Sequence, residues 1–292
     1  MLYSLEMITD MNKKVTIIIV GYNSWHYLQK NFASLDFLKE DKDVEVLYID
    51  NGSTDETRTA VEYSYPNVRM ICCTENKGVA AAKNIGIINA YPSEYLLFLD
   101  SDTEFNPNAY ETMLNYMDEN PDVGLCSCKL VGQNGETQKS CRRFPRIRHL
   151  VKAYLHDVSL RYNMEWFSKD YKDTLYDMNQ TEPFEVDYTI GACHMIRRSA
   201  QIAVGFWDEN FFFGLDDADF CFRMKREGYK VICIPQVFIH HAYEHNTTTT
   251  QKFLSRLTWK KICGFYHYFK KVRLKKYSAI KSKFRLTTRK KS

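Results

Sequence analysis

The sequence has no apolar run that approaches the roughly 18 residues needed to cross a bilayer. Its first ten residues, MLYSLEMITD, have neither a positively charged start nor a continuous apolar stretch, so we expect neither a secretory signal nor a transmembrane segment. The nine cysteines show no CxxC spacing, which favours reduced core thiols in a cytosolic protein over a disulfide framework or a zinc site. Neither GxGxxG nor GxxxxGK(S/T) occurs, so the sequence does not support a dinucleotide fold or a P-loop.

Acidic residues are absent from one end of the chain. Residues 252–292 contain 15 Lys and Arg side chains and no Asp or Glu, whereas the other residues contain 25 basic and 36 acidic side chains. We do not expect a net-negative body to bind nucleic acid. The tail also carries many aromatic residues, so it could lie on an anionic membrane or pack on the body as a solvated helix. We therefore predict a main domain over 13–245 and a basic, aromatic-rich extension over 246–292.

Four short apolar runs, at residues 15–20, 44–49, 68–72 and 95–99, alternate with helix-like segments. This alternation predicts an α/β fold with a parallel, doubly wound sheet, whose ligands bind beyond the carboxyl ends of the strands. The residues that follow the four runs are Tyr22 and Asn23, the cluster from Asp50 to Asp55, the stretch from Glu75 to Gly78 with Asn76, and the pair Asp100 and Asp102. We expect these polar groups along one rim of the sheet.

Two of these positions also have a plainer interpretation. The cluster after Asp50 is rich in residues that form turns and helix N-caps, so it could be a turn alone. The helix predicted after Gly78 is rich in alanine, which close packing on the sheet would explain. Lys83 and Asn84 in its first turns are better placed for a nucleotide than for a core.

Asp100 and Asp102 follow a strand that reads as buried. Burying two unpaired carboxylates so close together is costly, and a hard divalent cation would remove that cost. The same residues fall at ligand positions of a calcium-binding EF-hand loop, but Phe105 stands where that loop needs glycine and a strand precedes it instead of a helix. A metal site at a strand end is therefore the favoured interpretation.

The second half adds an acidic cluster and a histidine pair. Asp216, Asp217 and Asp219 precede a helix predicted over 220–227, where acids favour the positive end of the helix dipole. A carboxylate crowded by like charges holds its proton more tightly, as a general base requires, and Asp217 is our choice. Residues 231–239 predict two short strands divided by Pro235, and His240 or His241 at their end could complete a metal site.

Taken together, six segments resemble the family 2 glycosyltransferases of the GT-A fold, and among them the bacterial rhamnosyltransferase-like members that build surface polysaccharides. They span about residues 15–241 in the expected order. The segments are VTIIIVGYNS, VEVLYIDNGSTDET, ENKGVAAAKNIGI, YLLFLDSDTEF, VDYTIGACHMIRR and GFWDENFFFGLDDADFCFRMKREGYKV. The resemblance implies a Rossmann-like nucleotide-binding half with a mixed central sheet, followed here by a basic C-terminal helical extension.

The resemblance also implies roles for individual residues. Asp100 and Asp102 match the DxD motif, in which Asp102 would bind Mg²⁺ or Mn²⁺ and Asp100 would reach the ribose or a metal-bound water. Asp216 and Asp217 match a Glu-Asp pair whose second acid is the base; because the first is Asp here, Asp216 stays open as the alternative base. His240 matches the histidine that completes the metal site, with His241 as the alternative. The residues that would hold the nucleotide are Tyr22, Asn23, Asp50, Asn76, Lys83 and Asn84, with Asp50 on the base.

The implied activity is metal-dependent, inverting transfer of a sugar from a UDP-, dTDP- or GDP-linked donor to a saccharide or lipid-linked acceptor. We expect a cytoplasmic enzyme, peripheral on the inner face of the membrane. Two other functions stay open. A sugar nucleotidyltransferase would need a glycine-rich basic loop near its start, and an inactive sugar-binding scaffold would have lost an acidic position. The acceptor loops are expected over about 133–182, where no motif identifies the sugar or the linkage.

Overall fold

The computed structural model describes residues 13–146, 175–211, 215–242 and 264–271. Its first half forms the predicted parallel strands, which are β1 (Lys13–Gly21), β2 (Val44–Asp50), β3 (Arg69–Cys72) and β4 (Ser93–Asp100). They lie side by side in the order β3-β2-β1-β4, which confirms the doubly wound pattern. Residues 17–19 of β1 are fully buried because helices cover both faces of the sheet.

The second half continues the same sheet with strands of both directions. β10 (Cys193–Arg197) is antiparallel to β4 and to β6 (Val123–Val131), and β11 (Lys230–His241) is parallel to β6. Two short strands, β5 (Thr103–Glu104) and β8 (Phe184–Glu185), pair antiparallel with β11. A separate ribbon joins β7 (Cys141–Arg142) to β9 (Tyr188–Thr189). The central sheet is therefore mixed, as expected.

One strand differs from the prediction. Residues 230–241 form the single strand β11, not two pieces divided at Pro235. The pairing with β6 shifts register between Ile234 and Phe238, so Pro235 lies in an irregularity where no ladder hydrogen bond is required of it. The strand continues through this bulge.

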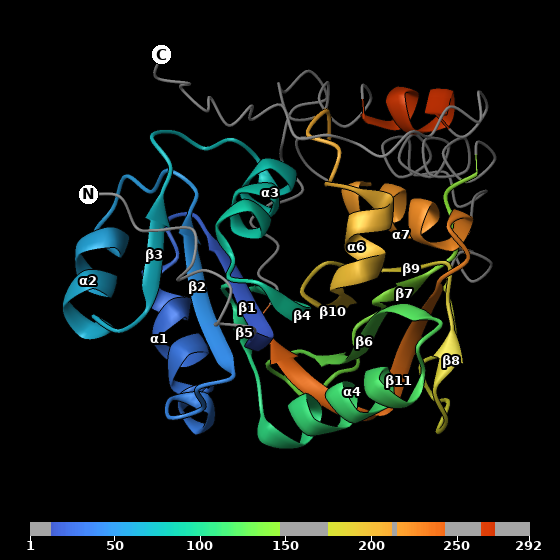
Figure 1. Cartoon of the computed structure of the whole chain (residues 1–292), viewed down its shortest axis with the longest axis horizontal. Coiled ribbons are helices and arrows are strands. Elements are labelled where there is room, and N and C mark those ends of the chain that lie inside the picture. Colours follow the sequence, from blue (N-terminus) through green and yellow to red (C-terminus); the bar gives the residue numbers. More distant parts are fainter. Residues whose placement is uncertain (1–12, 147–174, 212–214, 243–263, 272–292) are drawn as a thin grey trace, which may run out of the picture.

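Helices cover the two faces of the sheet (Figure 1). One core joins the sheet to α1 (Trp25–Ala33), α2 (Thr57–Ser64) and α4 (Pro107–Glu119), with a short 3₁₀ turn at Asp36–Leu38. The other core joins it to α3 (Val79–Asn89), α6 (Arg198–Val204) and α7 (Asp216–Arg226). The helix predicted over 220–227 thus begins earlier, and its first turn contains all three acids of the cluster.

Part of the basic extension lies against the body. Residues 264–271 are helical, and Tyr268 is buried in the same core as α6 and α7 (Figure 1). The rest of the extension lies outside the described residues, as does most of the segment expected to form acceptor loops. Within the described ranges, no helix is long and apolar enough to cross a membrane.

Candidate active site

The carboxyl ends of the first strands meet at one rim. Gly21 is in register with Asp50, and Val20 with Asp100. A cavity of about 180 Å³ opens there, and Tyr22 at its edge is 45% exposed. Its lining consists of Val20, Gly21, Tyr22, Asn51, Asn76, Gly78, Val79 and Ser101. The expected convergence of polar loops is confirmed.

Asp50 is a fully buried carboxylate beneath this rim. Its Oδ2 accepts a hydrogen bond from Arg58 Nε at 2.6 Å and from the Ser53 backbone N–H at 3.1 Å. Its Oδ1 has no partner among the described residues. A buried carboxylate with one satisfied and one unsatisfied oxygen is suited to accept a hydrogen bond from a ligand N–H.

Asparagine side chains fix the loops around the cavity. Asn51 Oδ1 accepts from the Lys77 N–H at 3.0 Å, and Asn51 Nδ2 donates to Asn76 Oδ1 at 3.3 Å. Asn23 Oδ1 accepts from the Thr54 N–H at 2.8 Å. The sequence predicts Asn23 and Asn76 at this rim. It does not single out Asn51, because Asn51 lies in a cluster of turn-forming residues and has no signal of its own.

Asp100, Asp102 and His241 form a cluster whose candidate ligand atoms all lie within 4.8 Å of one another. Burial and the neighbouring Asp102 raise the pKa of Asp100 to about 6. Burial alone would lower the pKa of His241, but Asp102 and Asp100 outweigh it and raise that pKa. Two carboxylates and one imidazole at this spacing fit a divalent cation, which would relieve the repulsion between the carboxylates.

The histidine in this cluster is His241, not the favoured His240. Side chains alternate across a strand, so the two neighbours point to opposite faces of β11. His241 is 3% exposed, with Nε2 3.5 Å from Asp102 Oδ1. His240 is exposed and contacts Phe238 edge to face at 5.6 Å. The assignment therefore moves by one residue.

Two side chains that sequence reasoning missed hold this cluster in place. Asn31 of α1 donates from Nδ2 to the carbonyl oxygens of Asp100 at 3.2 Å and Thr103 at 2.9 Å. Gln138 Oε1 lies 2.7 Å from His241 Nδ1, and Gln138 Nε2 donates to the His241 carbonyl at 2.8 Å. These partners are 69 to 103 residues apart in the chain, so no local motif reveals them.

A second acidic group lies beside α3. Lys83 Nζ is 2.9 Å from Asp217 Oδ1 and 3.6 Å from Asp216 Oδ2, and the Lys83 side chain is 3% exposed. Burial and the charge of Asp217 raise the pKa of Asp216 to about 7. Burial opposes ionisation of Asp217 as well, but Lys83 outweighs it and holds the Asp217 pKa below its ordinary value. The pair therefore divides into an ionised acid and one that titrates near neutrality.

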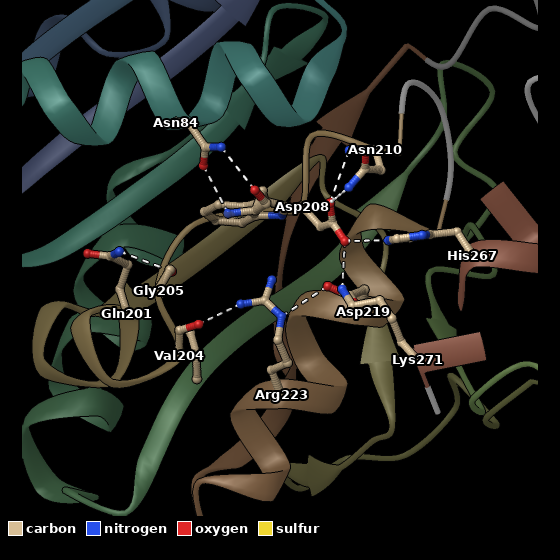
Figure 2. Close-up of polar contacts among 11 residues, drawn as sticks. Asn84, Gln201, Val204, Gly205, Asp208, Asn210, Asp219, Arg223, His267 and Lys271 are labelled. Carbon is tan, nitrogen blue, oxygen red and sulfur yellow. Dashed lines mark hydrogen bonds and ion pairs between the residues drawn. The ribbon is translucent and has the colours of Figure 1, made fainter. Parts of the chain in front are cut away.

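Asn84 points toward the loop that precedes α7 (Figure 2). Its Nδ2 donates to the Trp207 carbonyl at 2.9 Å and to Glu209 at 2.9 Å, and its Oδ1 accepts from the Trp207 N–H at 2.9 Å. The structure thus brings this residue to the loop before α7, not to the predicted nucleotide contacts. Its neighbour Lys83 reaches the same Trp207, with Nζ over the ring at 5.1 Å from the centroid.

Known proteins resemble this chain in sequence. The family model described as "Glycosyl transferase family 2" matches residues 16–205. An N-acetylglucosaminyl-diphospho-decaprenol L-rhamnosyltransferase of Mycobacterium tuberculosis is 26% identical over 249 residues, covering 81% of this chain and 78% of that protein. The dTDP-rhamnosyl transferase RfbF of Shigella flexneri is 24% identical over 234 residues, covering 80% of this chain and 70% of that protein.

Solved structures share the fold. GalNAc-T7 with UDP, GalNAc and Mn²⁺ gives a TM-score of 0.58 at 15% identity, covering 80% of this chain and 45% of that one. The mannosyltransferase PcManGT of Pyrobaculum calidifontis, in complex with GDP-Man and Mn²⁺, gives 0.55 at 19% identity, covering 93% and 67%. These likenesses support an α/β fold of the GT-A type with a mixed sheet. Because the family model matches well over half of its residues, the chain belongs to glycosyl transferase family 2 and is a glycosyltransferase.

Proposed function

We propose that this protein is a metal-dependent, inverting glycosyltransferase that moves a sugar from a nucleoside-diphosphate donor to a hydroxyl of a lipid-linked saccharide during surface polysaccharide synthesis. The observation that carries the proposal is the cluster of Asp100, Asp102 and His241 at the rim of the strand-end cavity. Lys83 and Asp217 form an ion pair whose charges both act on Asp100, so a sugar joined to a diphosphate at the cluster would lie near them.

The donor nucleotide is proposed to occupy the cavity between β1 and α3. Tyr22 offers an exposed ring for stacking, and Asp50 Oδ1 offers an acceptor without a partner in the described structure. An imide N–H of uracil or thymine suits such an acceptor, and the N–H groups of guanine do so as well. UDP, dTDP and GDP donors are therefore all retained for testing, although the Shigella relative is named for dTDP-rhamnose transfer.

The proposed cation site consists of Asp102 and His241, with Asp100 beside them, and Mg²⁺ or Mn²⁺ would fit it. A divalent cation bound there would supply charge stabilisation for the diphosphate leaving group. Asn31 and Gln138 hold the protein ligands ready, because each hydrogen-bonds a ligand residue directly.

Asp217 is proposed as the base. It would take the proton of the acceptor hydroxyl while that oxygen forms a bond to the anomeric carbon and the bond to the diphosphate breaks on the opposite face, which inverts the centre. In the donor-free protein Lys83 holds the Asp217 pKa low. A diphosphate bound near Lys83 would share that cation, and the proton affinity of Asp217 would rise when it is needed.

The acceptor is proposed to lie beside the β7–β9 ribbon. Arg142 of β7 is in register with Tyr188 of β9, and Ile190 then donates its N–H to the Ser140 carbonyl at 3.1 Å. The next residue, Gly191, lies so close to Asp217 that an added Cβ would meet Oδ1 at 2.7 Å. An arginine on the ribbon that leads to Gly191 suits an acceptor that carries a diphosphate, as the mycobacterial relative's name describes.

Thermal unfolding with UDP, dTDP and GDP, each with and without Mn²⁺, tests the donor site. Ligand at a hundred times its dissociation constant adds about 2.7 kcal/mol to the free energy of unfolding, which shifts the Tm by several degrees. We expect a metal-dependent shift with one nucleotide and its loss in Asp102→Asn. Glu104→Gln, at a side chain that is 45% exposed on the adjoining strand, is the control. The absence of a shift with all three would contradict the proposal and favour an inactive scaffold.

A further inference from the structure

Two carboxylates that the proposed chemistry does not use are buried behind the active site. Asp208 is 5% exposed in the loop before α7, and Asp219 is 0% exposed in the first turn of that helix. Ionised carboxylates at such burial are stable only when cations and hydrogen-bond donors surround them. The source of these cations is therefore informative.

The helix at 264–271 supplies one cation, Lys271, and a hydrogen-bonding histidine, whereas Arg223 of α7 supplies a second cation through its Nε, 3.0 Å from Asp219 Oδ2 (Figure 2). Lys271 Nζ lies 2.7 Å from Asp208 Oδ2 and 2.5 Å from Asp219 Oδ1, so one ammonium joins both carboxylates. His267 Nε2 also lies 2.7 Å from Asp208 Oδ2. Burial opposes ionisation of Asp208, but His267 and Lys271 outweigh it and hold its pKa well below the ordinary range.

Contacts with aromatic side chains pack the same helix against the body. The His267 ring meets Phe211 edge to face at a centroid distance of 5.2 Å, and the Lys271 ammonium lies 5.4 Å from that ring. Tyr268 is 1% exposed in the core shared with α6 and α7. The contact thus combines a buried aromatic anchor with a charge pair, which is more than a solvated surface helix would make.

The loop held by this helix contacts Lys83. Trp207 directly precedes Asp208, and its ring stacks on Phe220 of α7 at 3.8 Å. Lys83 Nζ lies over the Trp207 ring at 5.1 Å, and Asn84 clamps the Trp207 backbone through two hydrogen bonds of 2.9 Å (Figure 2). Asp219, the other carboxylate of the pair, follows Asp217 by two residues on α7.

We infer that His267 and Lys271 are positioning residues of the active site, through which the helix at 264–271 fixes the Trp207 loop and the start of α7, and thereby Lys83 and Asp217. The inference goes beyond the proposed function and rests on it only for the role of Asp217. On this inference, the catalytic unit extends past the boundary predicted at 245 to the helix that begins 19 residues later.

The test replaces Lys271 in the full chain. Lys271→Met keeps the apolar stem and removes the charge, Lys271→Arg keeps the charge, and Lys270→Met is the matched control because Lys270 is exposed on the same helix. For each variant, kcat for sugar transfer and the affinity for Mn²⁺ with nucleotide are measured well below the Tm. Amide hydrogen exchange of residues 207–211 and 216–221 is measured in parallel.

We expect Lys271→Met to lower kcat at least tenfold, to weaken nucleotide affinity by a clearly smaller factor because Lys83 is only one of the groups that would hold the nucleotide, and to speed exchange in both segments. Recovery is expected in Lys271→Arg and no change in Lys270→Met. Unchanged kcat and exchange in a folded Lys271→Met protein would overturn the inference, as would equal losses of kcat and nucleotide affinity. If neither the wild type nor any variant transfers sugar, the proposed function fails. The exchange result still decides whether the helix orders these two segments, so the two failures are distinguished.

Discussion

At the scale of single residues, the site depends on side chains that hold other side chains. Gln138 faces His241 Nδ1 with its carbonyl oxygen, which favours a proton on Nδ1 and leaves Nε2 directed at Asp102. Asn31 holds the backbone that follows β4. Neither side chain is expected to touch the cation or the nucleotide. Each instead fixes the geometry of a residue that does.

Replacing Gln138 should weaken metal binding. Without the amide, the His241 ring loses the acceptor that fixes its orientation, and outer-shell losses of this kind cost about 10- to 100-fold in metal affinity. We expect Gln138→Met to lower Mn²⁺ affinity at least tenfold in a titration followed by electron paramagnetic resonance. Gln133→Met, at an exposed position nearby, is the control. Equal affinity in the two variants would show that Gln138 does not orient His241.

Asp216 should make stability depend on pH. Its folded pKa of about 7 lies above the unfolded value, so the native state binds its proton more tightly and loses stability as the pH rises from about 4 to 7. Asp216→Asn removes that loss. We expect the Tm of the variant to exceed that of wild type by more at pH 8 than at pH 5. Glu40→Gln, at an exposed position, is the control and should change the Tm equally at both pH values. A larger gain at pH 5 would contradict the sign.

At the scale of elements, the alternation of side chains along strands and the small residues of helices determine where the site residues lie. The first four strands and their polar ends were predictable, because apolar runs and the residues that follow them are local patterns. His241 was not, because the bulge around Pro235 and the alternation after it decide which histidine faces Asp102. Nor was the direction of Asn84, since its partners in the Trp207 loop lie 123 residues away.

The approach of α3 to the sheet can be tested at Gly86. A Cβ there would meet Ile18 Cγ2 at 2.5 Å, so no side chain fits without displacing the buried Ile18 side chain. Helix propensity alone would make Gly86→Ala stabilising by about 1 kcal/mol. We expect instead a loss of about 1–3 kcal/mol in the free energy of unfolding by urea denaturation. A net gain would mean that α3 packs less closely than described.

At the scale of the whole molecule, charge separates a negative body from a positive tail. The docked helix at 264–271 uses part of the tail's charge on buried acids of the body, which composition could not predict because the pairing joins residues 52 to 63 positions apart. Nine of the 15 basic residues of 252–292 follow that helix. We propose that these basic residues attract the protein to the anionic inner surface of the membrane, where the proposed lipid-linked acceptor would lie.

Deleting residues 272–292 tests that proposal while retaining the docked helix. We expect the truncated protein to lose sedimentation with anionic vesicles, and the full chain to lose it on adding salt because the attraction is electrostatic. Neutral vesicles, which should bind neither form, are the control. Undiminished binding after truncation would remove the tail from the account of membrane association.

The most direct test of the central claim is sugar transfer by Asp217→Asn, measured with the donor identified by thermal unfolding and a saccharide acceptor linked to a lipid diphosphate. If Asp217 removes the proton of the acceptor hydroxyl, transfer should fall by about 10²- to 10⁴-fold, since a general base contributes on that scale. Binding of Mn²⁺ and nucleotide should persist, because their proposed ligands are untouched. Transfer at the wild-type rate, or loss of transfer together with nucleotide binding, would contradict the assignment of Asp217 as the base.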